Sequence, residues 1–109
     1  MQQAVSNLVD NAIKYTPDSG SVHVALRHRE GMARFEVTDS GYGIPETEQS
    51  NLFQPFKRVK TEETKTIEGT GLGLYSVKRI IERNRGEIIF TSQYGKGSTF
   101  GFTLPLVPE

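Results

Sequence analysis

The sequence Gly69-Thr70-Gly71-Leu72-Gly73-Leu74 marks the point where a long polar segment ends and an apolar helical pattern begins. Three glycines at alternate positions allow backbone conformations that other residues avoid, and they let a ligand approach the chain closely. At the start of a helix the first N–H groups have no partner within the helix and carry partial positive charge, which suits a phosphate group. By itself, this turn is a weak indication of a phosphate site.

The residues around the glycine turn argue against two common nucleotide folds. A dinucleotide fold needs an apolar strand directly before the glycines, but here the preceding residues 57–68 are polar. A phosphate-loop NTPase needs a lysine directly after the glycines, and this turn has none. Unstructured segments of this length in compact domains are usually functional lids or disordered. Because this one directly precedes the turn, we interpret residues 57–70 as a lid.

Near the start of the chain, apolar residues recur with helical spacing and predict a helix that ends before Pro17. Asn7, Asn11 and Lys14 share another face of that helix. Carboxamide oxygens are hard ligands that suit Mg²⁺, and an ammonium group suits a phosphate. The alternative interpretation of this face is an ordinary solvated polar surface.

The remaining segments predict an α+β fold. Alternating apolar residues indicate two antiparallel hairpins, over residues 21–38 and 87–104. A short helix is expected within residues 46–53, and a longer one runs from Leu74 to Asn84 and ends at Gly86. Between the first hairpin and the short helix lies Asp39-Ser40-Gly41-Tyr42-Gly43. Its acid either caps the turn or, as an ionised acceptor, bonds the exocyclic amine of an adenine.

Composition limits the function further. The chain has 109 residues, enough for one domain over residues 1–109, and its 13 basic and 13 acidic residues cancel. We therefore expect no nucleic-acid binding and no attraction to an anionic membrane. The absence of cysteine excludes disulfides and thiolate chemistry but says little about compartment. No apolar stretch is long enough for a membrane span, so a soluble piece is expected. His23 and His28 are five apart on one strand, on opposite faces, which argues against a shared metal site.

Taken together and in this order, the segments resemble the ATP-binding catalytic domain of the sensor histidine kinases, in the group that includes gyrase, Hsp90 and MutL. The resemblance covers nearly the whole chain and rests on five ordered motifs. They are the N box at residues 7–17, the first glycine box at 39–45, the F box at 52–56, the second glycine box at 69–74 and the closing motif at 97–100.

The resemblance implies a Bergerat-type α/β sandwich, with helices on one face of a mostly antiparallel mixed sheet and with ATP and Mg²⁺ between the helices and the lid. Asn11 would ligate Mg²⁺, and Asn7 would contact the metal or its waters. Lys14 would contact a phosphate, and Arg58 would reach the γ-phosphate from the lid, where its charge favours transfer. The phosphates would also accept hydrogen bonds from a group of residues in the second glycine box: Gly69, Thr70, Gly71, Leu72 and Gly73.

The resemblance also assigns the base end of the site. Tyr15 would pack against the adenine. Asp39 would accept a hydrogen bond from the adenine amine, and Thr99 would support that contact through a water molecule. The loop passing close to the base would contribute Gly41, Gly43 and Ile44.

One position separates a kinase from a hydrolase within this group. The ATP-hydrolysing relatives carry Glu four residues before the metal-binding Asn, where this chain has Asn7, which cannot take a proton from water. The resemblance thus implies phosphotransfer to a histidine on a separate domain of the same or a partner chain, followed by a response regulator. Alternatives are an ATP-binding regulatory module without phosphotransfer and an anti-sigma-type serine kinase.

The first residues already lie within a helical pattern, so we expect an N-terminally truncated domain, inactive without its acceptor domain. The family normally has a strand upstream of this point. Its absence would leave a sheet edge or an apolar groove uncovered, with a tendency to dimerise or exchange strands.

Overall fold

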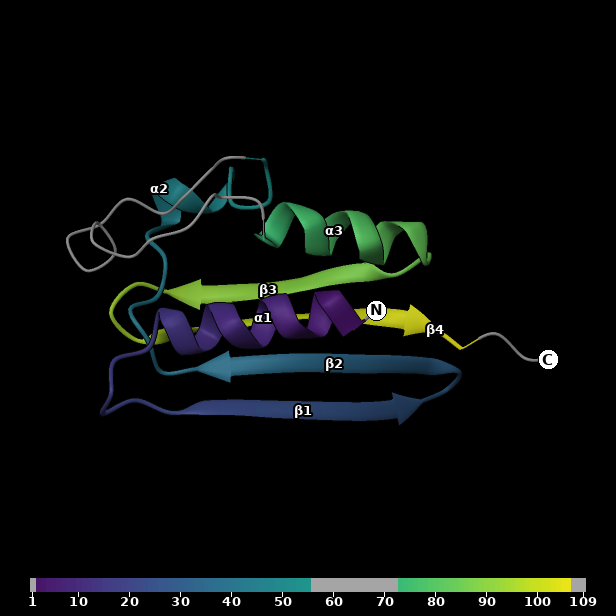
Figure 1. The fold of residues 1–109 in the computed structure, drawn as a ribbon, viewed down its shortest axis with the longest axis horizontal. Coiled ribbons are helices and arrows are strands. Elements are labelled where there is room, and N and C mark those ends of the chain that lie inside the picture. The colour runs from purple at the N-terminus through teal and green to yellow at the C-terminus, as the bar shows by residue number, and fades with distance from the viewer. Residues whose placement is uncertain (1, 56–72, 107–109) are drawn as a thin grey trace.

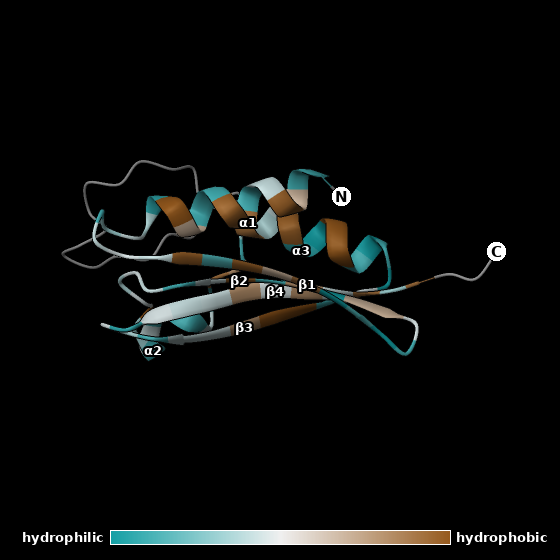
Figure 2. Cartoon of the chain, turned by 90° about the horizontal axis from the view of Figure 1, so that it is seen from below, coloured by the Kyte–Doolittle hydropathy of each residue, from teal (hydrophilic) through white to brown (hydrophobic). Residues whose placement is uncertain are grey.

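The computed structural model describes residues 2–55 and 73–106. In this part of the chain, two helices cover one face of a four-stranded antiparallel sheet with strand order β1-β2-β4-β3 (Figures 1 and 2). The predicted α+β fold is confirmed, and the described sheet is antiparallel throughout. In chain order, the elements are α1 (Gln2–Lys14), β1 (Val22–Arg29), β2 (Met32–Asp39), α2 (Glu46–Gln49), α3 (Gly73–Arg83), β3 (Glu87–Gln93) and β4 (Gly97–Pro105).

The two long helices lie side by side because each has one apolar stripe. Ala4, Leu8 and Ala12 of α1 are buried, as are Val77 and Ile81 of α3. These residues recur every three or four positions, so they fall on one side of each helix. As a result α1 and α3 share a single core with the sheet beneath them (Figure 2).

Both predicted helix ends are present, and each has a local cause. The hydroxyl of Thr16 donates to the carbonyl of Ala12 at 2.6 Å, and Pro17 follows, so α1 ends at Lys14. At the end of α3, the N–H of Gly86 donates to the carbonyl of Ile81 at 2.9 Å. This is the closing bond of a Schellman cap, and it places Arg85 at a φ of 64°.

The order of the strands brings distant parts of the sequence together. β1 and β2 form a hairpin through Glu30 and Gly31, which both have positive φ as a two-residue type I′ turn requires. β4 then inserts between β2 and β3, and its register pairs Asp39 with Ser98. The last residue of β2 therefore lies beside the start of β4, at one end of the sheet.

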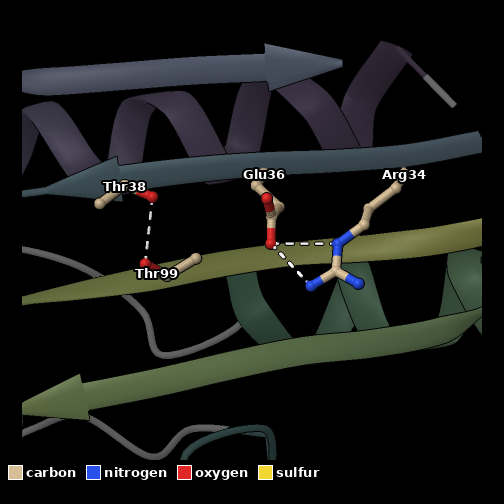
Figure 3. Close-up of polar contacts among 4 residues, drawn as sticks. All are labelled: Arg34, Glu36, Thr38 and Thr99. Carbon is tan, nitrogen blue, oxygen red and sulfur yellow. Dashed lines mark hydrogen bonds and ion pairs between the residues drawn. The ribbon is translucent and has the colours of Figure 1, made fainter. Parts of the chain in front are cut away.

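The two faces of the sheet differ. Side chains of the strands alternate, so Phe35 and Phe102, whose rings lie 5.3 Å apart, belong to the core under the helices. The opposite face carries the Arg34–Glu36 ion pair at 2.9 Å and the hydrogen bond between Thr38 and Thr99 at 3.0 Å (Figure 3). The long helices α1 and α3 lie on the other side of the sheet (Figure 2).

β1 is an edge strand in the described sheet, because it pairs with β2 alone. Val24 and Leu26 point toward the helix side through their register with Val37 and Phe35, yet they are 52% and 74% exposed. Val24 and Leu26 therefore form an exposed apolar strip on this edge strand. Among the described residues, no helix is long and apolar enough to cross a membrane.

Candidate nucleotide-binding site

A buried carboxyl group lies where β2 ends. Asp39 is only 9% exposed, and its Oδ1 accepts hydrogen bonds from the backbone N–H of Gly41 at 2.9 Å and of Ser98 at 3.3 Å. Burial raises the pKa of this carboxyl above its usual value, and the two N–H donors partly oppose the rise. Both donors in the described part of the chain bond Oδ1, which leaves Oδ2 as an acceptor for the amine of a bound base.

The glycine loop, residues 41–44, is held against the end of α1 and against the β3–β4 turn. The N–H of Tyr42 donates to the carbonyl of Tyr15 at 3.2 Å, and a Cβ at Gly41 would lie 2.3 Å from that carbonyl oxygen. Gly43 has a φ of 70°, and a Cβ there would lie 2.1 Å from the carbonyl oxygen of Gln93. Both positions thus require glycine, and the loop joins Tyr15 and Asp39 into one region.

The polar face of α1 continues from this region along the helix. Asn7 and Asn11 are half-buried and Lys14 is exposed at the end of the helix. Within residues 2–55 and 73–106, no three His, Cys, Asp or Glu residues gather into a metal site. A divalent cation at this face would therefore take amide oxygens from the protein and complete its shell with phosphate and water, as Mg²⁺ commonly does. The two asparagines fit that role.

The arrangement matches a known family. Residues 1–108 fit the profile of the family described as histidine kinase-, DNA gyrase B- and HSP90-like ATPases. The chain belongs to this family. The adaptive-response sensory kinase SasA of Synechococcus sp. (strain JA-3-3Ab) is 43% identical over 107 residues, which are 97% of this chain and 28% of that protein. The sensor-like histidine kinase SenX3 of Mycolicibacterium smegmatis (strain ATCC 700084 / mc(2)155) is 41% identical over 97% of this chain and 28% of its own length.

Solved structures show the same fold for this ATPase domain. The mycobacterial sensor histidine kinase MprB matches with a TM-score of 0.83 and 31% identity, over 98% of this chain and 72% of that one. Full-length ShkA in complex with AMPPNP matches with a TM-score of 0.81 and 28% identity, over 98% of this chain and 21% of that one. The chain is thus a histidine kinase-like ATPase domain that spans little more than a quarter of the curated relatives quoted above.

The structure brings together most of the residues expected at the base end. Tyr15, Asp39, Gly41, Gly43 and Ile44 all belong to the region described above. Gly73 is the first residue of α3. The expected lid over residues 57–70, with Arg58, lies outside the described residues, as do four residues of the second glycine box: Gly69, Thr70, Gly71 and Leu72.

Thr99 is the exception, and its expected place beside Asp39 needs correction. Its hydroxyl bonds Thr38 on the open face of the sheet (Figure 3). Asp39 pairs instead with Ser98, whose side chain lies on the opposite face from Thr99. The reason is the alternation of β4, which turns Ser98, Phe100 and Phe102 toward the helices and Thr99 away from them. The residue of the closing motif that reaches Asp39 is Ser98, which is buried and donates its backbone N–H.

Two further residues at this end were not expected from the sequence. Ser92 on β3 and Gln49 on α2 both bond the backbone of Ile44 at 2.8 Å. They are common polar residue types without a distinctive motif around them. In β3, however, alternation with the partly buried Ile88 and Phe90 already places Ser92 on the inner face.

Proposed function

We propose that this ATPase domain binds Mg-ATP and transfers the γ-phosphate to a histidine on a separate phosphoacceptor domain, in two-component signalling. The observation that carries the proposal is the buried Asp39 carboxyl, joined through the glycine loop to the end of a helix that bears Asn7, Asn11 and Lys14. A buried acceptor at one end and amides with a cation along the helix match the two ends of a nucleotide. The similar ShkA structure, solved with the ATP analogue AMPPNP, supports the same class of ligand.

The base end would recognise adenine through charge and shape. Asp39 would accept a hydrogen bond from the exocyclic amine, since an ionised carboxylate can only act as an acceptor. The ring of Tyr15 would pack on the base, and the two glycines of the loop would let the backbone pass close to it. The raised pKa of Asp39 means that this recognition weakens when acid protonates the carboxyl.

The phosphate end would be built from α1 and from the segment before α3. Asn11, with Asn7, would hold Mg²⁺, which neutralises phosphate charge when it is bound. Lys14 would contact a phosphate, and Arg58 would stabilise the charge that develops on the transferred group. Backbone N–H groups of residues 69–73 would bind the remaining phosphate oxygens.

Transfer rather than hydrolysis follows from the side chain at position 7. An amide at neutral pH takes no proton, so Asn7 would not activate water. Asn7→Glu is expected to introduce measurable ATP hydrolysis, whereas the matched Asn7→Gln should not. Equal hydrolysis by the two variants and the wild-type chain would contradict this role.

The direct test supplies the chain with Mg²⁺, labelled ATP and the acceptor hairpin of a similar kinase such as SasA. We expect label on the hairpin that is lost in acid and retained in alkali, as for phosphohistidine. Label with the opposite stability would indicate a serine kinase instead. Nucleotide binding without any labelled acceptor would favour a regulatory module, and absence of nucleotide binding would refute the site.

A further inference from the structure

The peptide groups of Ile44 are held at both polar atoms by side chains from two other elements. The N–H of Ile44 donates to Oγ of Ser92 at 2.8 Å, and Nε2 of Gln49 donates to the carbonyl oxygen of Ile44 at 2.8 Å. Nε2 of Gln49 also lies 3.5 Å from the carbonyl oxygen of Ser92. We call Ser92 and Gln49 the Ile44 clamp. It fixes the last residue of the glycine loop to β3 and to α2.

The hydroxyl of Ser92 also bonds the start of β4, the other strand of its own hairpin. Its Oγ lies 2.7 Å from Oγ of Ser98 and donates to the carbonyl of Gly97 at 3.2 Å. One hydroxyl has one proton and two lone pairs, so the bonds from Ile44 and Ser98 and the bond to Gly97 use its whole capacity. Ser92 therefore joins the glycine loop to the Gly97–Ser98 segment through a single atom.

These two segments supply both N–H donors that orient the Asp39 carboxyl. The donor of Gly41 comes from the glycine loop, and the donor of Ser98 comes from the β4 hairpin. Any change in the spacing of the two segments would alter the direction of the carboxyl. The clamp therefore controls the geometry of Asp39, although its two residues make no hydrogen bond to Asp39 in the described structure.

We propose that Ser92 and Gln49 are positioning residues that set the selectivity of this site for adenine over guanine, an inference that rests on the proposed function. Adenine presents an amine donor where guanine presents a carbonyl acceptor. A carboxylate in one fixed direction favours the amine and repels the carbonyl. With a loosened loop, Asp39 turns and water enters, so ATP binds less well and GTP is rejected less strongly.

The test compares Ser92→Ala, Gln49→Ala and the double variant with the wild-type chain. Thr91→Ala is the matched control, because it removes a hydroxyl from the same strand on the open face. Calorimetry measures the affinities for ATP, GTP and Mg²⁺-tripolyphosphate. Each clamp variant is expected to lose roughly fivefold to tenfold in ATP affinity, the usual effect of one hydrogen bond. Its preference for ATP over GTP should fall, and its tripolyphosphate affinity should stay unchanged.

Further variants separate positioning from general loss of structure. Ser92→Thr retains the hydroxyl and is expected to keep the ATP preference. The double variant should lose less than the product of the single losses, since both residues hold Ile44. An equal loss for all three ligands, or an unchanged ATP preference, would overturn the inference. If Ser92→Ala does not fold, Gln49→Ala answers the same question, because the side chain of Gln49 is only half-buried. A wild-type chain without ATP affinity would overturn the proposed function, and the inference with it.

Discussion

Replacing Asp39 with asparagine should separate nucleotide binding from folding. Asparagine has nearly the same shape, and its carbonyl oxygen would replace Oδ1 as acceptor for the N–H groups of Gly41 and Ser98 at 2.9 and 3.3 Å. The variant no longer buries a charge at a site where 9% of the residue is exposed. We therefore expect the free energy of unfolding without ligand to stay within about 1 kcal/mol of the wild-type value, or to rise.

Nucleotide affinity should change much more. The variant loses a charged acceptor and places an NH₂ donor opposite the amine of adenine. A hydrogen bond to a charged group contributes about 1.5–3 kcal/mol, so ATP should bind roughly tenfold to a hundredfold more weakly. Urea unfolding and calorimetry measure the two quantities on the same preparation. A fall of more than about 2 kcal/mol in the free energy of unfolding, or unchanged ATP affinity, would refute this role of Asp39.

The pH dependence of stability provides a check on the same residue. Because the pKa of Asp39 is raised in the folded chain, the folded state holds more protons than the unfolded state between the two pKa values. The stability that the protonated carboxyl adds to the folded chain is fully present below the pKa of the unfolded state. It is lost as pH rises through the pKa of the folded state. Asp39→Asn should remove this contribution, and an identical pH dependence in both proteins would contradict it.

Four further outcomes follow from the structure. Asn11→Ala should abolish the Mg²⁺-dependent part of ATP affinity, measured by titration with and without the metal, while the helix keeps its stability because Ala is a better helix former than Asn. In the wild-type chain, ATP affinity should fall as pH decreases through the raised pKa of Asp39, and a flat profile down to acid unfolding would contradict this. Arg85→Gly should stabilise the chain by about 1 kcal/mol in urea unfolding, since Arg85 has a φ of 64°, whereas the control Arg83→Gly within α3 should destabilise it. Leu26→Lys should reduce any self-association seen in sedimentation, because a lysine protects an exposed strand edge.

Local sequence rules predicted the elements of this fold well. The end of α1 follows from Thr16 and Pro17, and the first hairpin follows from alternation around Glu30-Gly31. The end of α3 was predicted from Gly86, although the residue that adopts the left-handed conformation is Arg85. In each case the signal and its cause lie within a few residues of one another.

Pairing between distant strands was not predictable in the same way. Nothing in the local pattern says that β4 inserts between β2 and β3, yet this pairing places Ser98 beside Asp39. Once Phe100 and Phe102 are taken as core residues, alternation assigns Ser98 to their face and Thr99 to the other. The error at Thr99 arose because the motif was transferred by position, without regard to which face of β4 each residue occupies.

The Ile44 clamp is a different kind of omission. Ser92 and Gln49 are 43 residues apart and meet only because α2 lies beside the end of β3 (Figure 1). Neither belongs to a motif of charged or metal-binding residues. Their importance becomes visible only when each hydrogen bond of the glycine loop is traced to its partner.

A calorimetric titration of the 109-residue chain with ATP, carried out with and without Mg²⁺, tests the central claim most directly. The proposed site predicts saturable binding of one ATP per chain, strengthened by Mg²⁺ and weakened when GTP replaces ATP. Absence of saturable binding in both conditions, in a chain that unfolds cooperatively and is therefore folded, would contradict it.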